Sequence, residues 1–88
     1  MKSYKLELTH QAESILERLV KREPELAKRL IQALDELEED PFQGKPLKGE
    51  LKGLYSYRVG SYRVVYQIRK HELLVIVIDI GHRRDIYR

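Results

Sequence analysis

Two arginines near the middle of the chain have the spacing of a phosphate-binding pair. Arg58 and Arg63 flank Gly60-Ser61 within LYSYRVGSYRVVYQ, residues 54–67. A two-residue turn, in which glycine supplies the positive φ of a type II′ geometry, places the arginines directly opposite each other on adjacent strands. Like charges opposed in this way destabilise a hairpin by roughly a few tenths to 1 kcal/mol. Two planar guanidinium groups nevertheless suit phosphate oxygens, so the pair predicts a phosphate site.

More basic side chains lie in the loop before this hairpin and at the end of the chain. The loop PFQGKPLKGELKG, residues 41–53, contains Lys45, Lys48 and Lys52, and the chain ends in GHRRDIYR, which includes Arg84. Residues 45–88 hold 10 Lys or Arg against 4 Asp or Glu, and residues 1–44 hold 7 against 10, so the halves carry +6 and −3. Lysine loops are often only solvated, and charges after an apolar strand also guard against aggregation. Taken together, the cations predict binding to a nucleic-acid backbone.

These residue types could also cleave RNA. RNA carries its own nucleophile, the 2′-hydroxyl, so cleavage needs a base, cations that stabilise charge on the phosphate, and an acid for the leaving oxygen. His82 could act as acid or base near neutrality, Tyr87 could donate or accept a proton, and Arg58, Arg63 and Arg83 could hold the phosphate. The sequence has no zinc motif, phosphate loop or serine-nucleophile motif, and its carboxylates lack the pattern of a two-metal nuclease. We therefore expect no metal and no cofactor.

The elements that would position these residues follow from hydrophobic periodicity. Residues 4–8 alternate as a first strand, and two amphipathic helices follow, one to about Arg22 and one that begins at Pro24. Pro41 and Gly44 end the second helix and open a long loop over residues 41–53. Two alternating strands and then LLVIVIDI, residues 73–80, complete the chain. Because LLVIVIDI is apolar on both faces, we expect it to be an interior strand covered on two sides.

The predicted fold is of the α+β class, with the element order β-α-α-β-β-β. The interior strand needs a second neighbour, and the N-terminal strand is the one available, so the sequence predicts a small, mostly antiparallel sheet of four strands in the order 1-4-3-2. The helical hairpin would pack on one face. Tyrosines and valines of the arginine hairpin alternate toward that core, and core packing is the commoner role for aromatic residues in such strands.

Length and composition indicate one cytoplasmic domain. A chain of 88 residues supports one hydrophobic core, so we expect a single domain over residues 1–88. The absence of cysteine suits a reducing interior. The N-terminus MKSYKLELTH lacks the apolar core of a signal peptide, and no apolar run approaches the length of a membrane span.

The order of elements and two motifs resemble the RelE/ParE toxin superfamily, specifically its RelE-like branch. The motifs are YRVVY at residues 62–66 and GHRRDIY at residues 81–87, and the resemblance covers nearly all of the chain. It implies a toxin of a bacterial or archaeal type II toxin–antitoxin system that cuts mRNA in the ribosomal A site. It also implies a cognate RelB-like antitoxin, bound in a hetero-oligomer, that keeps the toxin inactive.

The resemblance assigns roles to individual residues. Arg63 falls on the phosphate-stabilising arginine, Arg58 on a basic residue at the end of the preceding strand, and Arg83 on the arginine after the last long strand. Tyr87 falls on the tyrosine that orients or stacks on the substrate, and His82 resembles a histidine that YoeB-like relatives use nearby. The loop lysines Lys45, Lys48 and Lys52 fall in the loop that meets ribosomal RNA and the message.

Two positions depart from the pattern of the superfamily. RelE has a lysine where Ser56 aligns, and YoeB-like relatives have a catalytic glutamate where this chain has Lys45. The general base is therefore His82, a loop lysine, or no effective group. One alternative function is ParE-like inhibition of gyrase, against which GHRRDIY argues because those relatives generally lack it. The other is an RNA- or antitoxin-binding module that has lost catalysis.

Overall fold

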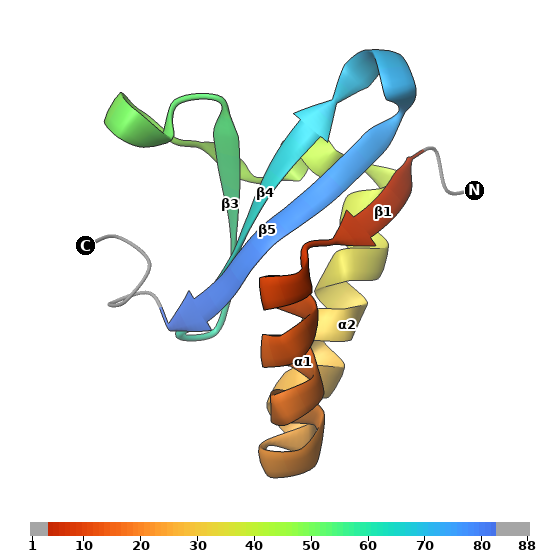
Figure 1. The fold of residues 1–88 in the computed structure, drawn as a ribbon, viewed down its shortest axis with the longest axis vertical. Coiled ribbons are helices and arrows are strands. Elements are labelled where there is room, and N and C mark those ends of the chain that lie inside the picture. Colours follow the sequence, from red (N-terminus) through yellow and green to blue (C-terminus); the bar gives the residue numbers. More distant parts are fainter. Residues whose placement is uncertain (1–3, 83–88) are drawn as a thin grey trace.

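Two helices pack side by side against one face of a twisted sheet (Figure 1). This architecture is seen in a computed structural model that describes residues 4–82. The order of elements confirms the predicted α+β class. In chain order they are β1 (Lys5–Leu8), α1 (His10–Arg22), α2 (Pro24–Glu39), β2 (Lys45–Pro46), β3 (Leu54–Val59), β4 (Tyr62–Arg69) and β5 (Leu74–His82), with 3-10 turns at Pro41–Gln43, Gly49–Leu51 and Lys70–Glu72.

The sheet has one more strand than the sequence predicts. Its order is β1-β5-β4-β3-β2, in which β1 and β5 are parallel and the other pairs antiparallel. The four long strands confirm the predicted order 1-4-3-2. The fifth strand, β2, lies inside the segment expected to be loop, where Lys45 pairs with Ser56 and Pro46 with Tyr55. Two residues that include a proline are too short to show alternation, so only the pairing partner reveals this strand.

The junction between β1 and α1 is fixed by a threonine. The Thr9 hydroxyl accepts a hydrogen bond from the Ala12 backbone N–H at 3.2 Å, which caps the helix. The same hydroxyl donates to the Ile78 carbonyl at 2.8 Å. One side chain therefore caps α1 and attaches its first turn to β5.

The core lies between the helices and the sheet, and it includes the tyrosine face of the hairpin. Tyr66 and Val64 are fully buried, and Tyr55, Tyr57 and Tyr62 pack against the same cluster. This confirms the predicted assignment of the tyrosines to the core. The other buried apolar residues of the cluster are Ala12, Leu19, Ala27, Leu30, Ala33, Leu34, Leu37, Val59, Val75, Val77 and Ile80.

The interior strand β5 differs from its prediction in two respects. It lies between β1 and β4 as expected, but within residues 4–82 both helices cover the same face, and Ile76 on the second face is only half-buried. A bulge also interrupts the strand, because Tyr66 pairs with Val77 and Val65 with Asp79. The extra residue resets the alternation, so that Val77 and Ile80 both face the core.

We expect Thr9→Ala to lower the free energy of unfolding by about 1 to 2 kcal/mol, because it removes both the helix cap and the bond to β5. Urea denaturation followed by circular dichroism measures the change. Ser14→Ala, at an exposed position on the same helix, is the matched control and should change stability little. Equal stabilities for the two variants would contradict a capping role for Thr9.

Candidate phosphate-binding site

The hairpin of β3 and β4 brings the two arginines together as the sequence predicts. Arg58 pairs with Arg63 and Val59 with Tyr62, which leaves Gly60-Ser61 as a two-residue turn. Gly60 has φ 62°, and Ser61 is not at positive φ, which fits a type II′ turn and excludes type I′. The glycine is needed because residues with a Cβ rarely adopt this backbone conformation.

The two arginines are held to different degrees. Arg63 is half-buried, and its Nη1 donates to the Ser56 hydroxyl at 3.3 Å. Ser56 is itself only 3% exposed, so its hydroxyl is a fixed acceptor beneath the guanidinium group. Arg58 is exposed, and its Nε lies 3.4 Å from the Gly60 carbonyl in a long hydrogen bond. Arg63 is thus pre-positioned, while Arg58 can change rotamer at lower cost.

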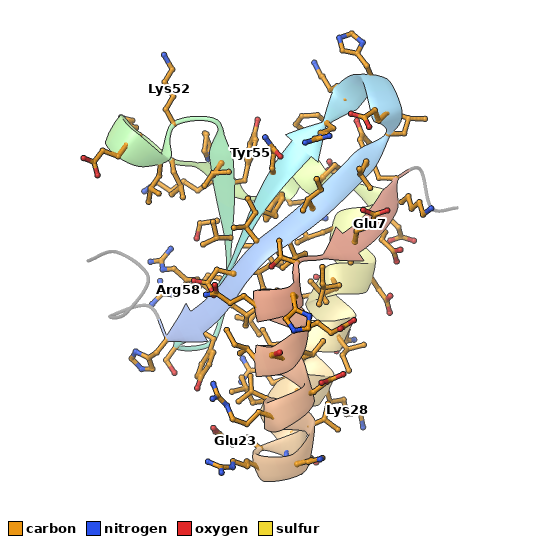
Figure 2. All side chains as sticks on the ribbon, viewed as in Figure 1. Glu7, Glu23, Lys28, Lys52, Tyr55 and Arg58 are labelled. Carbon is orange, nitrogen blue, oxygen red and sulfur yellow. The ribbon has the colours of Figure 1, made fainter. Side chains whose placement is uncertain are left out.

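Two of the three loop lysines lie at the same site. Lys45, Lys48 and Arg63 line an open depression of about 290 Å³ together with Pro46 and Leu47. A second depression, of about 360 Å³, adjoins it because Lys45 and Arg63 line both. Its other lining residues are Gln43, Gly44, Ser56, Tyr57 and Arg58. The structure therefore gathers Arg58, Arg63, Lys45 and Lys48 around one surface. Figure 2 shows Lys52 at a distance from Arg58, near the opposite end of β3.

A buried tyrosine holds the loop that carries Lys45. The Tyr66 hydroxyl donates to the Pro41 carbonyl at 2.6 Å and accepts from the Gly44 backbone N–H at 3.1 Å. A Cβ on Gly44 would overlap this hydroxyl, so glycine permits the close approach. Burial raises the pKa of Tyr66 from 10.0 to about 12, so the hydroxyl stays protonated further into the alkaline range. Because Gly44 directly precedes β2, this contact fixes the start of the strand and the position of the Lys45 backbone.

A second tyrosine connects the site to the helices. The Tyr57 hydroxyl donates to Glu36 Oε1 at 2.8 Å, and this bond joins β3 to α2. The Glu36 hydrogen bond, together with burial, raises the pKa of Tyr57. Glu36 is one of several acidic residues in the last turns of α2, on the helical side of the sheet. Acidic side chains of residues 1–44 therefore lie across the sheet from the cationic site.

His82 lies on the other face of the sheet from the arginine pair. It pairs with Tyr62, and the two rings are 5.8 Å apart in an edge-on arrangement. Tyr62 packs against the core, whereas Arg63 points to the second face. The bulge in β5 causes this placement, because uninterrupted alternation from Val77 would have put His82 on the face of Arg63.

The environment of His82 is a cleft between α1 and the end of the sheet. This cleft has a volume of about 360 Å³, and its charged or polar lining residues are Arg18, Arg22, Glu23, Tyr62, Asp79 and His82. The predicted site residues Arg83, Arg84 and Tyr87 lie outside the described residues. The structure thus brings Arg58, Arg63, Lys45 and Lys48 together. The roles of all the predicted site residues, His82 and Lys52 included, stay predictions.

Sequence reasoning missed the structural parts of the site. Ser56 departs from the pattern of the superfamily, but in the fold its hydroxyl accepts a hydrogen bond from Arg63. Tyr66 is recognisable as a core residue, yet its hydroxyl bonds depend on a loop 22 to 25 residues earlier in the chain. Alternation could not reveal the Tyr66 bonds, because they join segments that are distant in sequence. It does place Ser56 and Arg63 on one face of the hairpin, but not the hydrogen bond between their side chains.

Two further properties bear on the class of protein. Within residues 4–82, no group of three or more His, Cys, Asp or Glu side chains is arranged to hold a metal ion. Nor does this part of the chain contain a helix with the length and apolarity required to cross a membrane.

The β-α-α-β-β-β-β chain, with two arginines on the sheet face that the helices leave uncovered, shares its architecture with a chain of a solved toxin–antitoxin complex. The chain belongs to the family described as ParE toxins of type II toxin–antitoxin systems, which it matches over residues 6–87. This confirms the resemblance to the RelE/ParE superfamily.

Three relatives place the chain on the RelE side of that superfamily. It is 42% identical over 57 residues to the toxin RelG of Mycobacterium tuberculosis and 49% identical over 45 residues to the toxin RelE of the same organism. These matches cover 64% and 51% of this chain but only 66% and 46% of the relatives. The toxin–antitoxin complex RelBE2 of M. tuberculosis contains a chain with a TM-score of 0.81 and 32% identity, with 97% of each chain covered.

We expect Tyr66→Phe to lower the free energy of unfolding by about 1 to 3 kcal/mol, because it leaves the Pro41 carbonyl and the Gly44 N–H without their buried partner. Chemical denaturation measures the loss. Tyr57→Phe is the matched control, since it removes a hydroxyl whose hydrogen bond is solvent-exposed, and it should cost less. Equal losses for the two variants would show that the buried bonds of Tyr66 stabilise the fold no more than the exposed bond of Tyr57 does.

The raised pKa of Tyr66 also predicts a dependence of stability on alkaline pH. The folded chain retains the Tyr66 proton to about 12, whereas the unfolded chain loses it near the ordinary value of 10.0. The contribution of the Tyr66 proton to the free energy of unfolding is therefore complete below pH 10 and is lost as the pH rises toward 12. Denaturation curves across this range should show a smaller fall for Tyr66→Phe than for the wild type. Parallel curves for the two proteins would refute the prediction.

Proposed function

We propose that this protein is a ribosome-dependent endoribonuclease toxin that cleaves mRNA in the A site and so inhibits translation. The observation that carries the proposal is the surface on which Arg63, fixed by Ser56, shares two adjoining depressions with Lys45, Lys48 and Arg58. Four cations on an open surface suit an extended polyanion better than an enclosed small substrate. The similarity to toxins named RelE and RelG supports RNA cleavage as the activity.

The proposed reaction begins with attack of the 2′-hydroxyl on the neighbouring phosphate. The 2′-oxygen forms a bond to phosphorus, its proton passes to a base, and the bond to the leaving 5′-oxygen breaks as that oxygen takes up a proton. Arg63 would bind the phosphate oxygens through its planar fork while negative charge develops on them. Because this route uses the nucleophile that RNA supplies, we propose that it needs no metal ion.

The roles of the remaining predicted residues belong to the same proposal. Arg58 would share the phosphate with Arg63, and Arg83 would supply a third guanidinium group. Tyr87 would orient or stack on the substrate, and His82 would act as acid or base. The lysines Lys45, Lys48 and Lys52, together with Arg84, would contact ribosomal RNA and the message.

We further propose a cognate, RelB-like antitoxin as the protein partner, in a cytoplasmic hetero-oligomer. The similar chain in the M. tuberculosis RelBE2 structure belongs to a toxin–antitoxin complex, which supports this partner.

One competing function has specific support. The family that the chain matches is named for ParE, so inhibition of gyrase is the second candidate. It would use the chain as a binder without RNA chemistry. The relatives named RelE and RelG favour the nuclease over this alternative.

Mapping of mRNA 5′ ends during translation, after induction of the toxin, tests the nuclease. We expect codon-internal cuts that fall by about 100- to 1,000-fold in Arg63→Ala, because the variant loses charge stabilisation in the transition state. Arg83→Ala should reduce them as well. Arg69→Ala is the matched control, because it removes an arginine of the same strand that does not line the site. Arg69 instead forms an ion pair with Glu72, with 3.5 Å between Nη1 and Oε2. Intact messages together with gyrase stalled on DNA would instead establish the second candidate.

A further inference from the structure

A third arginine, from the helical layer, reaches the turn of the arginine hairpin. A Cβ built on Gly60 would lie 3.2 and 3.3 Å from the two terminal nitrogens of Arg29, which belongs to α2. On the same residue, the Gly60 carbonyl lies 3.4 Å from Arg58 Nε. Guanidinium groups from α2 and β3 therefore meet at one glycine. The absence of a side chain on Gly60 leaves room for Arg29.

Among the described residues, no acidic side chain balances this meeting of charges. Within residues 4–82, neither Arg29 nor Arg58 forms an ion pair with a carboxylate. Like charges placed close together repel, and the repulsion grows as their separation falls. A bound anion would remove that repulsion, and the planar forks of arginine match phosphate oxygens in geometry as well as in charge.

The order of the three arginines gives the site a direction. Arg63 lies on the sheet face that the helices leave uncovered, and Arg58 pairs with it on the neighbouring strand. Arg29 lies against Gly60 of the turn, and the carbonyl of Gly60 also contacts Arg58. A polyanion that crosses Arg63 and Arg58 would therefore continue toward α2. A lone small anion needs only one of these groups, whereas a row of cations suits consecutive phosphates of a nucleic-acid strand.

We propose that Arg29 is a further phosphate-binding residue, and that the Gly60 turn, with Arg29 and Arg58, holds a second backbone phosphate of the bound RNA. This inference rests on the proposed function, because it takes RNA as the ligand of the neighbouring Arg63 site. Arg29 would extend the basic surface into residues 1–44, whose net charge is −3. The net charge of that half does not predict an anion-binding residue there.

A comparison of binding by Arg29→Gln and Lys28→Gln tests the inference. Lys28 is the adjacent residue of α2 and carries the same charge, but it lines an apolar depression with Val20 and Ile31 instead of the turn. Figure 2 shows Lys28 on α2, at a distance from Arg58. The probe is a ribosome programmed with an mRNA whose A-site codon carries 2′-O-methyl groups, which block the nucleophile and leave the phosphates intact. Affinity is measured over a series of salt concentrations.

Loss of one phosphate contact should weaken binding by about three- to tenfold at low salt and reduce the slope of log K against log salt by about 0.7 to 0.9. We expect this for Arg29→Gln and not for Lys28→Gln, with Arg29→Lys intermediate because it keeps the charge and loses the fork. Thermal melting separates a structural role. If Arg29 only packs on the turn, Arg29→Gln lowers the melting temperature without changing the salt slope.

The outcomes separate this inference from the function on which it rests. If Arg63→Ala weakens binding while Arg29→Gln behaves as Lys28→Gln does, the second phosphate site is refuted and the proposed function stands. If Arg63→Ala also binds normally, both fail.

Discussion

The register of the β3–β4 hairpin is the constraint on which the rest of the molecule depends. A two-residue turn that requires positive φ at Gly60 fixes the pairing, and the pairing assigns every side chain of two strands to a face. Tyrosines and valines then build the core under the helices, and Arg58 and Arg63 face the depressions beside β2. A slip of one residue would exchange the two faces, bury guanidinium groups and expose the tyrosines. Stability and the cationic surface are therefore specified by the same turn.

The buried side chain of Tyr66 links the hairpin to the loop that precedes β2. Tyr66 contributes its ring to the core and its hydroxyl to Pro41 and Gly44, so packing of the core also determines where β2 starts. Lys45 is exposed and long, yet its backbone is paired with Ser56, the residue that accepts from Arg63. The lysine and the arginine are thus placed by the same strand. Loop residues that take part in binding are commonly positioned by a rigid scaffold in this way.

Much of this arrangement could be predicted from local patterns. Alternation in residues 54–67 and the Gly60-Ser61 turn predict the register, and helical spacing predicts α1 and α2 together with their core faces. The two failures in the fold, strand β2 and the bulge in β5, both depend on the neighbouring strand. Strand β2 exists because β3 lies beside it, and the bulge at Ile78 has no signature in a run of apolar residues. That one extra residue decides on which face His82 lies, and the catalytic role of His82 stays a prediction.

Ser56 shows how a departure from a family pattern can still fit the proposed chemistry. A serine hydroxyl does not act as a base at neutral pH without a partner that removes its proton, so it does not replace the lysine expected in RelE. It does accept a hydrogen bond from Arg63 at a position that is almost fully buried, which lowers the number of rotamers open to the guanidinium group. Catalysis by charge stabilisation depends on such pre-organisation, because cations that are already in place need not reorient as the reaction proceeds. With lysine at position 45 in place of a glutamate, the described site contains cations and hydrogen-bond donors but no carboxylate base among the residues that line its depressions. A nuclease built on this site would derive its rate mainly from binding the developing phosphate charge, and would rely on groups outside the arginine surface for proton transfer.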